Sequence, residues 1–142
     1  MTDTEGFSQA ELQAMKERAA ELRALKGGKK KGDNLEALLA KIDELPSGDK
    51  QIAVALHQVV TEVAPDLAPR LWYGMPAYEK DGDVVVFLQL TSKFDTRYST
   101  LGFNQGAQLD DGEMWPTHFA IPAITDGVKD RMRALLRKAV GG

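Results

Sequence analysis

Residues 71–90, LWYGMPAYEKDGDVVVFLQL, decide the fold of this chain. The dipeptide Asp81-Gly82 favours a tight two-residue β-hairpin turn. The nearly continuous apolar run from Val84 to Leu90 follows it, which is typical of a strand buried deep in a sheet. The segment 71–80 supplies the partner strand. The sequence therefore predicts a hairpin whose second strand lies in the interior of the protein.

Two further strands are predicted after this hairpin. Residues 98–103 read as a third strand and residues 117–121 as a fourth. The intervening stretch 105–113 is polar, acidic and contains glycine, as loops do. Because the chain shows no alternation of strands and helices in this region, we expect an antiparallel sheet of about four to five strands.

Three helices are predicted around the sheet. Apolar residues recur at helical spacing in two segments that end near Pro46 and Pro65. Thr125 can cap a last helix. The predicted apolar stripes are Leu35, Leu38, Leu39, Ile42 and Leu45; Ile52, Leu56, Val59, Val60 and Val63; and Val128, Met132, Leu135, Leu136 and Val140. Together with the sheet they predict an α+β fold.

The amino-terminal part of the chain is predicted to be an extension. A capping-box pattern opens at Ser8, and residues 8–24 read as a peripheral helix. The lysine- and glycine-rich stretch 26–33 favours an open connection. We therefore divide the chain into an extension, 1–32, and a main α+β domain, 33–142. A homodimer with the first helix in its interface is one hypothesis for this extension.

Composition narrows the classes of function. The chain of 142 residues is 43% hydrophobic, has no cysteine and carries a formal net charge of only −3. The lack of cysteine removes thiolate chemistry and Cys-based zinc sites and fits a cytoplasmic location. No apolar run is long enough to span a membrane, so no membrane partner is expected. The low net charge gives no global attraction to nucleic acid.

Three segments of this chain resemble the YdhG-like family, a bacterial family classed as a domain of unknown function. They are LWYGMPAY at 71–78, YSTLGF at 98–103 and Trp115-Pro116. The resemblance covers about residues 52–139. It implies a fold related in outline to frataxin and, by analogy with some members, a role as an intracellular iron chaperone. It implies no reaction and no set of catalytic residues.

A metal site, if the chain has one, is predicted on the acidic loop. Iron that is held weakly and passed on suits exposed carboxylate oxygens. Asp110, Asp111 and Glu113 supply three carboxylates within four residues, and Asp126 and Asp130 could join them. The alternative is an ordinary solvated turn, because Asp111-Gly112 is itself a turn signal. Iron is thus the one cofactor that the sequence suggests.

An aromatic pocket for a small organic ligand is the second hypothesis. Trp72, Tyr78, Tyr98 and Trp115 belong to a dense group of aromatic residues around the predicted hairpin. The alternative is that they are core residues, since strand alternation sends about half of such side chains inward. This hypothesis describes a small-molecule-binding or protein-interaction domain.

The sequence contains few signals of zinc binding, catalysis or nucleic-acid binding. The chain has two histidines, His57 and His118, too few for a three-histidine zinc site. No hydrolase, metalloprotease or dinucleotide motif occurs, so enzyme activity is not indicated. Lysines at 26 and 29–31 could contact phosphates, but no aromatic residues interleave them and no reading motif accompanies them. A solvated linker is the preferred interpretation of that arm.

Overall fold

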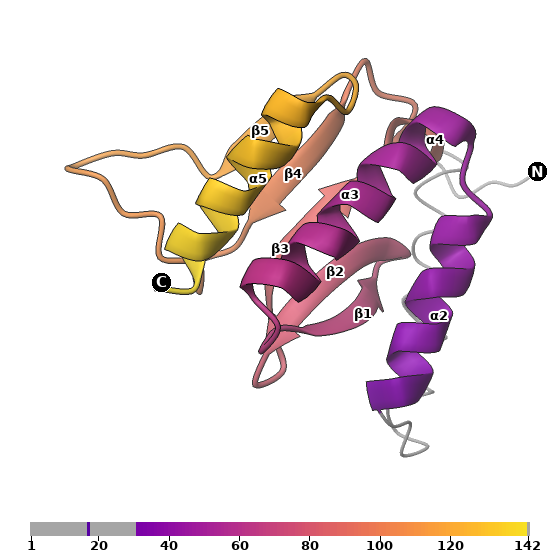
Figure 1. Cartoon of the computed structure of the whole chain (residues 1–142), viewed down its shortest axis with the longest axis horizontal. Coiled ribbons are helices and arrows are strands. Elements are labelled where there is room, and N and C mark those ends of the chain that lie inside the picture. Colours follow the sequence, from indigo (N-terminus) through magenta and orange to yellow (C-terminus); the bar gives the residue numbers. More distant parts are fainter. Residues whose placement is uncertain (1–16, 18–30, 142) are drawn as a thin grey trace, which may run out of the picture.

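The computed structural model describes Glu17 and residues 31–141 (Figure 1). The elements are α2 (Lys31–Asp43), α3 (Ser47–Val63), β1 (Ala68–Trp72), β2 (Met75–Lys80), β3 (Asp83–Gln89), α4 (Thr91–Phe94), β4 (Ser99–Phe103), β5 (His118–Ile121) and α5 (Asp126–Ala139). The helix predicted for residues 8–24 lies outside the described residues except for Glu17. Most of the extension predicted for residues 1–32 lies outside them too.

The strands form one antiparallel sheet in the order β1-β2-β3-β4-β5. Each strand pairs with the next one along the chain, so the sheet is a meander with β3 at its centre. The predicted α+β class and the antiparallel sheet are confirmed. The sheet has five strands, at the upper end of the predicted range.

The fifth strand arises because the segment 71–80 is split into two. Trp72 pairs with Met75, so Tyr73 and Gly74 form a two-residue turn between β1 and β2. Both residues have positive φ, 53° and 76°, as a type I′ turn requires. The segment predicted as one partner strand is therefore a hairpin by itself. The sequence prediction missed this turn because Tyr-Gly is not among the dipeptides that usually mark it.

The second hairpin turn lies where the sequence predicts it. Lys80 pairs with Asp83, and the two residues between them, Asp81 and Gly82, have φ values of 53° and 89°. These values again fit a type I′ turn. The predicted hairpin at Asp81-Gly82 is confirmed.

The main core lies between one face of the sheet and the helices. In Figure 1, α3 and α5 lie across this face, and α2 lies beside β1, the strand at one edge of the sheet. Strand β3 places Val86 and Leu88 on this face, and both are fully buried. The helices contribute Leu38, Leu56, Val59, Val60, Met132 and Leu136, which are all buried. Apart from Leu35 and the exposed Leu39, the apolar stripes predicted for the three helices lie in or against this core.

A second, smaller apolar cluster lies on the opposite face of the sheet. Met75, Ala77 and Phe87 are buried there, and Trp72 packs against them. The rings of Trp72 and Phe87 meet edge to face, with centroids 5.2 Å apart. Strand β3 is therefore buried on both faces, which explains its nearly continuous run of apolar residues.

The helix ends follow local sequence signals, except that α2 begins earlier than predicted. The hydroxyl of Thr125 accepts a hydrogen bond from the backbone N–H of Val128, which confirms the predicted cap of α5. Helix α2 begins at Lys31, so the last three residues of the stretch predicted as an open connection are helical. Asp33 lies in the first turn of α2, where a carboxylate interacts favourably with the helix dipole. Among the described residues, no helix has the length and apolar character needed to cross a membrane.

Gly102 of β4 is predicted to be essential for packing of the second cluster. It pairs with Phe87, and a Cβ at Gly102 would lie 2.7 Å from Cε1 of that ring. We expect Gly102→Ala to lower the free energy of unfolding by about 2 kcal/mol, because the ring must move out of a packed position. Urea denaturation monitored by circular dichroism measures this change.

The matched control is Gly48→Ala in the first turn of α3. A Cβ there meets no atom within 4 Å. Alanine is a better helix former than glycine, so this variant should be as stable as the parent or up to about 1 kcal/mol more stable. Equal stability of the two alanine variants would contradict the tight packing at Gly102.

Candidate functional site

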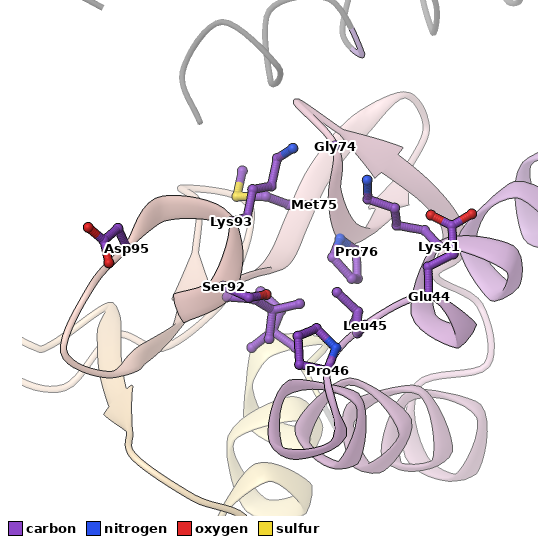
Figure 2. Close-up of a pocket in the computed structure, with 12 residues that line it drawn as sticks. Lys41, Glu44, Leu45, Pro46, Gly74, Met75, Pro76, Ser92, Lys93 and Asp95 are labelled. Atoms are coloured by element: carbon purple, nitrogen blue, oxygen red, sulfur yellow. The ribbon is translucent and has the colours of Figure 1, made fainter. Parts of the chain in front are cut away.

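The candidate site lies beside a cavity of about 680 Å³ next to the Tyr73–Gly74 turn. The end of α2, the start of α3, the beginning of β2 and the region of α4 surround it (Figure 2). This volume falls in the range of small-molecule sites, which is roughly 300–1,000 Å³. The lining residues are Lys41, Glu44, Leu45, Pro46, Gly74, Met75, Pro76, Leu88, Leu90, Ser92, Lys93 and Asp95.

Two lysines from distant parts of the chain converge at this cavity. Lys41 is in the last turn of α2 and Lys93 is in α4. Figure 2 shows their ammonium groups on either side of Gly74. Each ammonium group binds a different oxygen of the Glu17 carboxylate: Lys41 Nζ lies 2.5 Å from Oε2, and Lys93 Nζ donates to Oε1. One carboxylate thus bridges two cations.

Gly74 permits this approach. A Cβ at position 74 would lie 2.7 Å from Cδ of Glu17 and 2.8 Å from Nζ of Lys93. Any other residue would therefore push the carboxylate and the lysine away from the turn. The positive φ of Gly74 adds a second reason for glycine at this position. Turn geometry and the charged contact depend on the same residue.

Lys93 is positioned by a buried carboxylate in α3. Asp49 is 7% exposed and accepts hydrogen bonds from the hydroxyl of Thr91 and the backbone N–H of Ser92, at 2.9 and 3.0 Å. These bonds connect the first turn of α3 to the first turn of α4. The backbone N–H of Thr91 also lies 3.3 Å from the hydroxyl oxygen of the buried Ser99. The backbone that carries Lys93 is therefore held from two sides.

The charges around Glu17 favour the ionised form of its carboxyl group. Partial burial by itself raises the pKa of Glu17, but the hydrogen bonds from Lys41 and Lys93 and the attraction of their charges outweigh it. The net result is a pKa below the ordinary value of 4.5. The side chain of Lys41 is 23% exposed, that of Lys93 11% and that of Glu17 18%. Water therefore screens the contact only in part.

The rest of the cavity is mostly apolar. Leu88 and Leu90 are buried and come from β3 and the residue before α4. Leu45 and Pro46 contribute the connection between α2 and α3, and Pro76 belongs to β2. Glu44 and Asp95 line the cavity as well, but both are exposed, and Figure 2 shows the Asp95 carboxylate apart from the two lysines. The cavity therefore combines cations at one edge with an apolar wall.

The four aromatic residues of the predicted pocket do not meet at one place. Tyr78 is 1% exposed in the main core, and its hydroxyl lies 2.9 Å from Nδ1 of His57. Trp72 is on the opposite face of the sheet. Tyr98 is half-buried with the guanidinium of Arg97 5.0 Å above its ring, and Trp115 packs against the main core from the loop before β5. The aromatic pocket stays a prediction without geometric support.

The predicted metal ligands lie on the long loop between β4 and β5. Asp110, Asp111 and Glu113 are all exposed there. Across Glu17 and residues 31–141, no group of three or more His, Asp or Glu side chains is placed to hold a metal ion. Iron binding by this loop therefore stays a prediction. The two histidines have separate partners: Nδ1 of His57 lies 2.9 Å from the hydroxyl of Tyr78, and Nδ1 of His118 lies 2.9 Å from the hydroxyl of Thr117.

Sequence reasoning missed the residues that form the site. Lys41 and Lys93 are 52 positions apart and belong to no common pattern, and Glu17 lies in what was predicted as a peripheral helix. The signal that could have helped is Gly74 in the quoted segment LWYGMPAY, because a glycine inside a strand often marks a close approach. A scan of protein-family models finds no match, and no similar curated protein or solved structure is found. Membership of the YdhG-like family thus stays a prediction.

The pH dependence of stability should report the Glu17 contact. Since the pKa of Glu17 is lowered by folding, its contribution is present above about pH 4.5 and is lost as the pH falls through the lower folded value. We expect the parent to be more stable than Glu17→Gln at about pH 7 and the difference to shrink below about pH 4. Urea denaturation of both proteins at a series of pH values measures this. A pH-independent difference would contradict the assigned ionisation.

The pKa of His57 is also lowered in the folded protein, but here the neutral form is favoured. Burial lowers its pKa from the ordinary value of 6.5, so the folded protein takes up its proton later than the unfolded chain does. The resulting stability is present above about pH 6.5 and falls as the pH decreases through that value. NMR titration of the His57 ring should give a midpoint below that of an unfolded reference peptide. A His57 midpoint above that of the peptide would contradict burial as the dominant effect.

Proposed function

We propose that this protein binds a small organic anion in the cavity beside the Tyr73–Gly74 turn. One observation carries the proposal: two lysines from separate elements line this cavity, and both bind the carboxylate of Glu17. An ammonium group that is partly removed from water binds an anion more strongly than a fully solvated one does. The paired lysines thus supply the charge recognition of a binding site.

The remaining features support a ligand with an organic part. Leu45 and Pro46 give the cavity accessible apolar surface, and the buried Leu88 and Leu90 belong to the same lining. Small-molecule sites combine such walls with a few placed polar groups that fix the ligand's orientation. The volume of about 680 Å³ accommodates more than an inorganic ion. The proposal keeps the small-molecule hypothesis of the sequence and moves its site from the aromatic residues to the lysine pair.

The site is also preorganised. Asp49 fixes the start of α4 through two hydrogen bonds, and the hairpin turn at Gly74 fixes the opposite side. A site held on short, well-anchored elements loses little conformational entropy when a ligand binds. This arrangement suits a binding protein.

A thermal-shift assay of the full chain tests the proposal. The probes are acetate, benzoate, octanoate and inorganic phosphate. We expect at least one of them to raise the melting temperature of the parent, because a ligand that binds the folded state stabilises it. The rise should disappear in the double variant Lys41→Gln/Lys93→Gln, since both recognising charges are gone.

The matched control is Lys80→Gln, which removes an exposed lysine at the end of β2 from outside the cavity lining. It should respond to the anions as the parent does. A rise that persists in the double variant would place the anion elsewhere on the protein. The absence of any rise, in the parent and in Glu17→Gln alike, would overturn the proposal.

A further inference from the structure

The Glu17 carboxylate occupies the position that a ligand's own acidic group would need. It contacts Lys41 and Lys93 and lies against Gly74, and all three of these residues line the cavity. The contact joins residues 24 and 76 positions apart in the sequence. Glu17 thus shows which chemical group fits between the two ammonium groups.

We infer that the ligand of this site is a monocarboxylate with an apolar body, and that its carboxylate binds between Lys41 and Lys93 by displacing Glu17. This inference rests on the proposed function and adds the chemical class of the ligand and an internal competitor. The ligand's apolar body lies along Leu45 and Pro46.

The stoichiometry of the contact favours a carboxylate. Glu17 presents two oxygens, and each oxygen takes one ammonium donor. A phosphate monoester carries more charge and three terminal oxygens, for which several donors are usually assembled. A lysine ammonium is a compact point charge, so one lysine per oxygen matches a two-oxygen anion.

The surrounding charges favour a single negative charge. The cavity lining includes two lysines but also two carboxylates, Glu44 and Asp95. Like charges at the rim of a site disfavour the approach of a doubly charged ligand. A monoanion meets less of this repulsion than a dianion does.

The apolar wall sets the character of the rest of the ligand. Leu88 is fully buried and Leu90 is 3% exposed, whereas Leu45 is half-buried and Pro46 is exposed, so Leu45 and Pro46 supply the apolar surface that a hydrocarbon group can contact. Each buried CH₂ of a ligand strengthens binding by about fourfold. Binding should therefore strengthen with the length of an aliphatic chain until the cavity is filled.

In the absence of a ligand, the Glu17 carboxylate occupies the position between the two lysines. A ligand must compete with a carboxylate of the same chain, so its apparent affinity is reduced by the fraction of molecules in which Glu17 occupies the site. Glu17→Gln removes the competing charge and keeps the size of the side chain. The variant should bind a monocarboxylate more tightly than the parent does.

Isothermal titration calorimetry of the full chain with sodium octanoate tests this inference. We expect Glu17→Gln to bind octanoate at least about tenfold more tightly than the parent. Glu36→Gln is the matched control, because Glu36 is an exposed glutamate of α2 that is not part of the cavity lining. It should bind as the parent does. 1-Octanol and inorganic phosphate serve as the neutral and the doubly charged comparison ligands.

The outcomes separate the inference from the proposed function. If phosphate binds Glu17→Gln more tightly than octanoate does, and the lysine variants abolish this binding, the protein binds anions but the carboxylate class is wrong. Equal octanoate affinity of the parent and Glu17→Gln would overturn the role of Glu17 as a competitor. Equal binding of 1-octanol and octanoate would overturn recognition by charge. If none of the ligands binds to Glu17→Gln, the inference and the proposed function both fail.

Discussion

Burial of strand β3 on both faces is the constraint on which the rest of the structure depends. Four consecutive residues, Val85 to Leu88, are buried, so the two faces of this strand both need apolar partners. Helices α3 and α5 cover one face. Trp72, Met75 and the ring of Phe87 form the cluster on the other face. A central strand of this kind fixes where its neighbours must lie.

The position of the candidate site follows from this arrangement. In an antiparallel meander with tight turns, alternate connections lie at the same end of the sheet. The Tyr73–Gly74 turn and the segment that leaves β3 therefore share one end, and α4 begins there. This places Lys93 beside Gly74. The end of α2, with Lys41, contributes the second cation because α2 packs along β1.

The charged contact at this place has a limited effect on stability. Ion pairs that are partly removed from water gain Coulomb energy but lose solvation, and the two effects largely cancel. A ligand carboxylate can make the same contacts with Lys41 and Lys93. Replacing Glu17 by such a ligand therefore changes the sum of Coulomb and solvation energy only slightly. For the proposed ligand, apolar contacts along Leu45 and Pro46 would then decide which carboxylate is preferred.

Local physical chemistry in the sequence by itself determined the α+β class with an antiparallel sheet, the Asp81–Gly82 turn, most of the three helical stripes and the cap at Thr125. These features depend on residues close together in the chain, whose spacing and backbone preferences are visible without a fold. Only the tertiary structure decided the turn at Tyr73–Gly74, where pairing of Trp72 with Met75 overrides an unremarkable dipeptide. It alone also brought Glu17, Lys41 and Lys93 together, because contacts across 24 and 76 positions arise from packing and leave no periodic trace in the sequence.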